Sequence, residues 1–345
     1  MTDSPDVSPP TAPPRAGLDI ALNSGLAVAL IGILVIGGLF GYQIYVDRQR
    51  AEAANPAMRV VTSIREQVRQ SPNDAILRVR LGEALGAAGR FDEAIEQFNA
   101  ALQIDPEHIG AYLDLGIVAM LTGNYPDAVS YFERVAELTD ATQFRNVDER
   151  RERAFYNLGL ISIEEQRYED AVGYLKEALR IRKSVSDTYY QLARAYQGLE
   201  NPMGAIDNLE IALAFDPKYA EAHYLMGQLY MELDDPINAS VHFYRAAQIK
   251  PEAEPPQEAL ASLGPAEEWA ERAHTALEAK RLDEAIQEVL VARNLDPGNA
   301  GYAELHGDIL LASGDAAAAR AVYEAALELD PESTVIQRKI DRIGS

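Results

Sequence analysis

Residues 91–106 read FDEAIEQFNAALQIDP and contain the pattern that decides the fold. Ala94, Phe98 and Ala101 lie three or four residues apart, which places them on one face of a helix. Pro106 ends that helix, because proline lacks the backbone N–H that a helix needs. The same spacing of small residues returns at intervals of 34 residues along most of the chain. A fixed period of this length predicts stacked copies of one supersecondary unit.

Two small-residue positions, twelve residues apart, define this repeat. The first is occupied by Gly82, Gly116, Gly159, Ala193, Gly227, Ala273 and Gly307. The second is occupied by Ala94, Ala128, Ala171, Ala205, Ala239, Ala285 and Ala319. A unit of 34 residues accommodates two helices of about 13–15 residues and two short turns. Small side chains at these positions would let the two helices approach closely, so we expect an all-α fold of seven helix pairs.

The quoted segment and Trp269, in the sixth unit, carry a resemblance to a known family. The sequence resembles a tetratricopeptide repeat (TPR) array, whose pattern is W-x2-L-G-x2-Y followed by Ala, Phe, Ala and Pro at fixed offsets. The resemblance implies a right-handed TPR superhelix, an α-solenoid of about seven helix pairs. Residues 75–253 would form TPR units 1–5, and residues 254–331 a Pro-rich joint with units 6 and 7. Residues 332–345 would form a capping helix, which repeat arrays need at their ends.

Two insertions interrupt the period. The first, residues 143–151, is charged and is either a binding element or a tolerated surface insertion. The second covers residues 254–265 and contains Pro255, Pro256 and Pro265. Its proline content is typical of a stiff linker, so we predict a joint between a block of five repeats and a block of two.

The segment before the repeats has three predicted parts. Residues 1–17 are a Pro-rich tail that is too polar to form a core and is expected to be disordered. Residues 18–46 form an apolar run long enough for a transmembrane helix, and too long for the alternative, a cleaved signal peptide. Within it, Gly37 and Gly41 form a small-xxx-small pair that predicts a helix contact in the membrane. Residues 47–74 read as a linker and a half-repeat helix.

The apolar run predicts a single-pass membrane localisation, with two readings of its orientation. Arg15 precedes the run, whereas Arg48, Arg50, Arg59 and Arg65 follow it, and this asymmetry favours a cytoplasmic repeat domain. A resemblance to bacterial proteins with one N-terminal anchor and envelope-side repeats favours the opposite side of the membrane. Both orientations stay open at this point.

Composition excludes several kinds of chemistry. The 345 residues include 54 acidic and 31 basic side chains, and no cysteine. Disulfides, cysteine nucleophiles and cysteine-ligated metals are therefore excluded. The acidic excess argues against nucleic acid as a partner, because a polyanion is bound by clustered Lys and Arg. No zinc, phosphate-loop or nucleophile motif occurs. We therefore predict no catalytic residue, no cofactor and no metal, and a protein that is not an enzyme.

Binding of proteins or peptides is the remaining prediction. By the TPR pattern, the first helices of consecutive units line a groove. The predicted partner-binding residues are Arg153, Tyr156, Asn157, Tyr190, Gln191, Arg194, Tyr224 and Gln228. The three tyrosines recur at the repeat spacing and offer contact area at a small entropic cost. The TPR clamp for chaperone tails is absent, because Leu113, Ile117 and Asp187 replace its polar residues.

Together these features predict a membrane-anchored, non-enzymatic TPR scaffold that binds partner proteins or peptides in its groove and assembles a membrane-associated complex. Two alternatives stay open. One is a chaperone-like factor for envelope assembly or cytochrome maturation, which the resemblance to envelope repeat proteins implies. The other is an integral structural subunit of a larger membrane or filament complex. The acidic surface itself is interpreted as a source of solubility.

Overall fold

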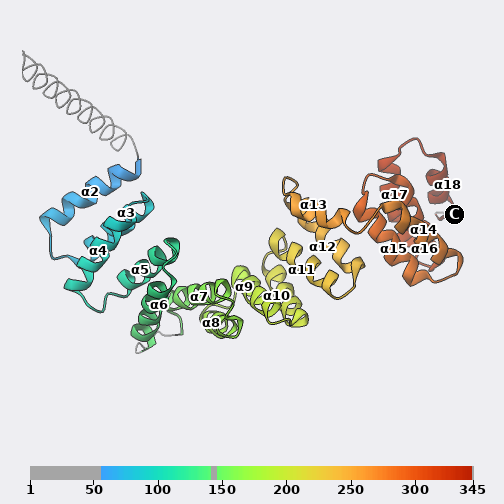
Figure 1. Cartoon of the computed structure of the whole chain (residues 1–345). Helices are drawn as coiled ribbons and strands as arrows, with labels where there is room; N and C mark the ends of the chain where they lie inside the picture. Colours follow the sequence, from blue (N-terminus) through green and yellow to red (C-terminus); the bar gives the residue numbers. More distant parts are fainter. Residues whose placement is uncertain (1–55, 141–145, 344–345) are drawn as a thin grey trace, which may run out of the picture. The chain divides into compact units, whose positions relative to one another are not determined.

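A computed structural model describes residues 56–140 and 146–343 (Figure 1). Within these ranges the chain is all-α, with seventeen helices and no strand. The helices are α2 (Pro56–Gln70), α3 (Ala75–Ala87), α4 (Phe91–Ile104), α5 (Ile109–Leu121), α6 (Tyr125–Asp140), α7 (Glu149–Glu164), α8 (Tyr168–Ile181), α9 (Ser186–Gly198), α10 (Pro202–Phe215), α11 (Ala220–Glu232), α12 (Pro236–Ile249), α13 (Glu254–Ala261), α14 (Ala266–Glu278), α15 (Leu282–Leu295), α16 (Ala300–Ala312), α17 (Ala316–Leu329) and α18 (Thr334–Ile343).

The chain divides into two compact units, and the boundary follows Ala111. In the first unit, α2 packs against α3 and α3 packs against α4. Leu81 and Phe98 are almost fully buried where α3 and α4 cross. Asp74 begins α3 as an N-cap, since its carboxylate accepts a hydrogen bond from the backbone N–H of Leu77 at 3.0 Å. The first unit is thus built by the pattern that the quoted segment predicts.

The second unit stacks the remaining repeats. The helices pack as the pairs α7–α8, α9–α10, α11–α12, α14–α15 and α16–α17. The second helix of a pair also packs against the first helix of the next pair, as α8 does against α9 and α10 against α11. Each repeat therefore buries its apolar face against its neighbour, which is why such units are stable only in series.

The glycines at the first small position are required by close packing. A Cβ atom placed on Gly227 would lie 2.5 Å from the ring of Phe243, and one on Gly307 would lie 2.4 Å from the ring of Tyr323. The residue sixteen positions later is large in both cases that have leucine there: Gly159 faces Leu175, and Ala193 shares a core cluster with Leu209. A small residue at the first position therefore leaves room for a large side chain at the crossing.

The second insertion contains a short helix in the repeat register. Helix α13 begins at Glu254, 34 residues after the start of α11, and packs against α12. Helix α12 also packs against α15, and the side-chain amide of Asn294 donates a hydrogen bond to Ser240 Oγ at 3.1 Å. Packing thus continues across the predicted joint. At the other insertion, the residues from Glu149 onward extend the N-terminal end of α7.

The predicted single-pass membrane localisation is corrected by the structure. Among residues 56–140 and 146–343, no helix has both the length and the apolar character needed to cross a membrane. The longest helices there, α6 and α7, have 16 residues. At 1.5 Å per residue such a helix is about 24 Å long, whereas the hydrocarbon core of a bilayer is about 30 Å thick. The predicted span, residues 18–46 with Gly37 and Gly41, lies outside the described residues.

Candidate functional site

Three first helices, α5, α7 and α9, enclose a cavity of about 380 Å³ that we call the first-helix cavity. Three of the predicted partner-binding residues, Arg153, Tyr156 and Asn157, line it. The other lining residues are Ile117, Met120, Glu152, Arg182, Val185, Asp187 and Thr188. Ile117 and Met120 of α5 and Val185 before α9 supply the apolar residues, whereas α7, α9 and the C-terminal end of α8 supply the charged and hydrogen-bonding groups. The cavity therefore presents an apolar wall and a polar wall to a ligand.

Asp187 is held in the first-helix cavity by two tyrosines from different repeats. The hydroxyl of Tyr156 donates to Asp187 Oδ2, and the hydroxyl of Tyr219 donates to Oδ1 at 2.7 Å. Burial raises the pKa of both tyrosines above its ordinary value, and the hydrogen bond to the Asp187 carboxylate raises it further. Both hydroxyls therefore stay protonated, and together they fix the position of the carboxylate between α7 and the turn before α11.

Glu152 and Arg153 are adjacent charged residues on α7, but only Glu152 is paired among the residues that the structure describes. The Glu152 carboxylate is 3% exposed, and Arg182 Nη2 lies 3.1 Å from each of its oxygens. This pair is structural, because a buried carboxylate without a partner is strongly destabilising. Arg153 is exposed and lines the first-helix cavity, and no ion pair or hydrogen bond engages its guanidinium within the described ranges. Its five N–H donors are therefore free to bind a ligand.

Thr188 adds a buried hydroxyl to the first-helix cavity. The side chain is 1% exposed, and Oγ1 has no hydrogen-bond partner among the residues that the structure describes. Leaving such a group unsatisfied costs about 1–3 kcal/mol. Asn157 donates through Nδ2 to the carbonyl oxygen of Arg153 at 2.8 Å, which leaves its Oδ1 as an acceptor. A ligand that both donates and accepts hydrogen bonds would complement this wall.

Sequence reasoning missed Thr188 and Tyr219, for different reasons. Thr188 stands at the third position of its repeat, where neighbouring repeats have Ala111, Ala154 and Ala222. A hydroxyl at a position that is alanine in these neighbouring repeats could have indicated a special role for Thr188. Tyr219 lies in a turn, 32 residues from the carboxylate it contacts. No local pattern indicates that contact, because it depends on how consecutive repeats stack.

The predicted residues of α9 lie beside the first-helix cavity but do not line it. The ring of Tyr190 is 5.0 Å from the ring of Tyr219, measured between centroids. Arg194 donates to Gln191 Oε1 at 2.9 Å, and its guanidinium lies 3.7 Å from Glu164. These side chains extend the polar and aromatic surface from α7 toward α11.

The predicted residues of α11 are also outside the first-helix cavity. Tyr224 packs against the buried Phe243, with ring centroids 5.8 Å apart, so one part of its ring belongs to the core. Gln228 is half-buried on the same helix. The structure thus gathers three of the eight predicted residues into one cavity and places five on the two helices that follow.

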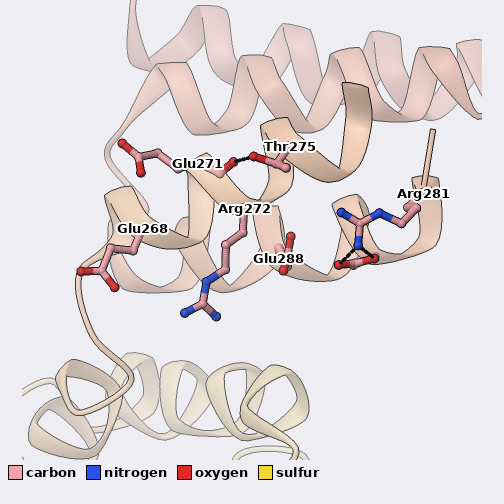
Figure 2. Close-up of a pocket in the computed structure, with 7 residues that line it drawn as sticks. Glu268, Glu271, Arg272, Thr275, Arg281 and Glu288 are labelled. Atoms are coloured by element: carbon pink, nitrogen blue, oxygen red, sulfur yellow. Dashed lines mark hydrogen bonds and ion pairs between the residues drawn. The ribbon is translucent and has the colours of Figure 1, made fainter. Parts of the chain in front are cut away.

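A second cavity lies between α14 and α15 and is dominated by acidic residues (Figure 2). Its volume is about 470 Å³, and its lining includes Glu268, Glu271 and Glu288 together with two arginines. Burial raises the pKa of the Glu288 carboxyl, and the nearby Glu284 raises it further. Arg281 pairs with Glu284 at 2.5 Å. Within the ranges that the structure describes, no group of three or more His, Asp or Glu side chains could hold a metal ion.

Family comparisons agree with the repeat pattern. Models described as "Tetratricopeptide repeat" match residues 44–109, 85–146 and 154–189, and one described as "Tetratricopeptide repeat-like domain" matches residues 182–345. Among curated proteins, the peroxisomal targeting signal receptor of Saccharomyces cerevisiae is 29% identical over 80 residues. That alignment covers 23% of this chain and 13% of the receptor. The receptor of Candida glabrata is 28% identical over 82 residues, or 24% of this chain and 14% of the receptor. The chain therefore spans about one eighth of these relatives.

Solved structures match about half of this chain. YrrB, a TPR protein with an unusual peptide-binding site, matches with a TM-score of 0.48 and 19% identity, over 57% of this chain and 96% of YrrB. MamA from Desulfovibrio magneticus RS-1 matches with a TM-score of 0.47 and 22% identity, over 52% of this chain and 97% of MamA.

Proposed function

We propose that this chain, which belongs to the tetratricopeptide repeat family, binds an extended segment of a partner protein along its first helices α5, α7, α9 and α11, and acts as a non-enzymatic scaffold. The observation that carries the proposal is the first-helix cavity, in which Arg153, Tyr156 and Asn157 meet the unsatisfied hydroxyl of Thr188. Partner binding rather than catalysis also fits the sequence, which contains no recognisable catalytic motif.

The free hydrogen-bonding groups of the cavity suit a peptide backbone. A peptide unit offers one N–H donor and one C=O acceptor. Arg153 offers only donors, Asn157 offers its free Oδ1 as an acceptor, and the Thr188 hydroxyl can do either. An extended peptide lying over α7 and α9 would therefore satisfy Arg153 and Asn157 directly, and would satisfy the buried Thr188 hydroxyl after a small shift of the side chains that cover it.

The apolar wall would receive a side chain of the same peptide. Ile117 and Met120 from α5 and Val185 before α9 line this wall. Methionine adapts its shape to different apolar partners, so the wall would accept more than one kind of aliphatic or aromatic side chain. Peptide capture would then combine backbone hydrogen bonds, which are independent of the peptide sequence, with one apolar anchor.

The proposal is tested by selecting peptides from a random peptide-display library on the full chain and measuring their affinity by fluorescence anisotropy. Arg153→Ala should weaken the selected peptides about tenfold, because a hydrogen bond to a charged group is lost. Tyr190→Ala combined with Arg194→Ala tests the continuation of the surface along α9 and should also weaken binding.

Arg180→Ala is the matched control, since Arg180 is exposed, pairs with Glu177 at 2.9 Å and lies outside the first-helix cavity. Its affinity should equal that of the wild type. Selected peptides that bind all variants equally would show that these first helices are not the binding face.

A further inference from the structure

A third cavity, of about 710 Å³, lies where the end of α10, the turn before α11 and the end of α12 meet. Two cations, Lys218 and Arg245, line this basic cavity, and so does His223. No aspartate or glutamate is among the described residues that line it. Leu213 and Ile249 supply apolar walls. It is separate from the first-helix cavity, because the two share no lining residue.

Neither cation of the basic cavity is neutralised by the protein. Arg245 donates only to the neutral Gln248, at 3.3 Å, and no carboxylate within the described ranges pairs with Lys218 or Arg245. Nearby cations behave differently: Lys250 pairs with Glu221, and Arg182 pairs with Glu152. Acidic side chains outnumber basic ones by 54 to 31, so a cation without a partner is not explained by a shortage of carboxylates.

The lack of a carboxylate partner among the described residues distinguishes this repeat. Glutamate follows three of the other closing prolines, at Glu107, Glu252 and Glu332, whereas Lys218 follows Pro217. On the second helix, the place of Arg245 is held by Arg134 in the second unit and by Glu177 in the third. Arg134 pairs with Glu137, and Glu177 pairs with Arg180, whereas Arg245 donates to the neutral Gln248. The lysine and the missing carboxylate together leave positive charge at this place.

His223 lines the basic cavity together with the two cations. Its Nδ1 lies 3.0 Å from Nδ1 of His242, and its Nε2 lies 3.3 Å from the carbonyl oxygen of Pro217. Burial lowers the pKa of His223, and the positive charge of Arg245 lowers it as well. The imidazole is therefore neutral at pH 7 and sits beside two positive charges that lack a counter-ion in the protein.

We propose that the basic cavity binds a small oxyanion, a carboxylate or a phosphate on a compact organic body, with Lys218 and Arg245 as its cationic ligands. Arginine binds such groups through two parallel N–H donors, and lysine adds a mobile point charge. The apolar walls would contact the organic body, and the volume lies within the range of small-molecule sites. This site is independent of the proposed peptide binding.

The test uses the full chain labelled with ¹³C in its histidine rings, at constant pH and an ionic strength held constant with sodium chloride. Citrate and inorganic phosphate are titrated separately, and the ring signal of His223 is followed by NMR. A saturable shift with citrate identifies a carboxylate site, and a saturable shift with phosphate identifies a phosphate site. No saturable shift with either probe overturns the proposal.

Variants decide whether the cations of the basic cavity are responsible. Lys218→Glu introduces the residue that follows three of the other closing prolines, so the turn should fold, and Arg245→Gln removes the second charge. Each should weaken anion binding at least tenfold. Arg180→Gln, which changes a cation elsewhere, should leave it unchanged. Equal affinity in Lys218→Glu and the wild type would also overturn the proposal.

Discussion

The middle repeats, residues 152–249, and the C-terminal repeats, residues 266–329, share one packing scheme but differ in what they expose. Gly227 faces Phe243 in the middle repeats, and Gly307 faces Tyr323 in the C-terminal ones. The middle repeats carry the first-helix cavity and the basic cavity, whereas α14 and α15 carry the acidic cavity of Figure 2. The small and large residues at the repeated positions therefore build the fold. The residues between those positions determine which charged and polar groups line the cavities of each repeat.

The largest expected effect comes from breaking the shared packing. Gly227→Ala should lower the free energy of unfolding by about 3 kcal/mol, the upper end of the usual cost of overpacking, because the new Cβ would lie 2.5 Å from the Phe243 ring. Adding Phe243→Leu should recover part of the loss, as the natural pair Ala193 and Leu209 indicates. Urea denaturation measures both changes.

Gly173→Ala is the control for this prediction, because a Cβ at Gly173 meets no atom within 4 Å. It should raise the free energy of unfolding by about 0.5–1 kcal/mol, since alanine is the better helix former. If Gly227→Ala were as stable as Gly173→Ala, close contact at the crossing would not explain the glycine.

The next effect concerns histidines that are buried in each region. Burial lowers the pKa of His242 and of His306 to about 4; the neighbouring His223 adds to the effect on His242, and Arg293 to that on His306. The unfolded value is about 6.5. Because the folded state favours the neutral ring, the associated stability is fully present above pH 6.5 and is lost as the pH falls toward 4.

His306→Gln should therefore reduce the loss of stability between pH 6.5 and pH 4 by about 2 kcal/mol. Arg293 Nη1 donates a hydrogen bond to His306 Nδ1 at 2.7 Å in the wild type, and a glutamine can keep this bond because its Oε1 accepts. Urea denaturation at several pH values provides the measurement.

A smaller effect separates binding from stability in the middle repeats. Thr188 and Ser162 both have a buried hydroxyl without a partner within the described part of the chain, but only Thr188 lines the first-helix cavity. Thr188→Val and Ser162→Ala should each raise the free energy of unfolding by about 1 kcal/mol, because an unsatisfied polar group is removed. Thermal unfolding measures this gain.

Only Thr188→Val should also weaken the selected peptides, by about fivefold in fluorescence anisotropy. A Thr188→Val variant that is more stable but binds the peptides less tightly would indicate that the hydroxyl serves ligand binding rather than stability. Should Thr188→Val bind the peptides as tightly as Ser162→Ala does, the hydroxyl of Thr188 would play no part in recognition.

The smallest effect belongs to the acidic cavity of the C-terminal repeats. The pKa of Glu288 is raised, so its ionised form is disfavoured in the folded state, and this penalty disappears as the pH falls below the unfolded value of about 4.3. Glu288→Gln should thus stabilise the protein by about 0.5 kcal/mol at pH 7 and by nothing at pH 4. Denaturation curves that show the same gain at both pH values would argue against a charge effect.

Sequence reasoning predicted the helix pairs well because their spacing is local. The segment from Phe91 to Pro106 contains α4, and the small positions at Gly82 and Gly227 are where helices cross. The partner-binding residues stay a prediction. Of the eight, Arg153, Tyr156 and Asn157 lie within five residues on one helix and share a cavity, and the other five lie on α9 and α11 outside it, an arrangement that depends on how the repeats stack. The membrane localisation was wrong for the described ranges.

By itself, the sequence determined the period, the helical class and the family, because each depends on residues at fixed spacing along the chain. Only the tertiary structure decided which polar groups are satisfied. It paired Glu152 with Arg182 and Asp187 with Tyr219, about 30 residues apart. It left the side chains of Arg153, Thr188 and Lys218 without partners in the described part of the chain, and gave Arg245 only the neutral Gln248. The physical reason is that hydrogen bonds and ion pairs depend on distances of about 3 Å between repeats, which periodicity does not specify.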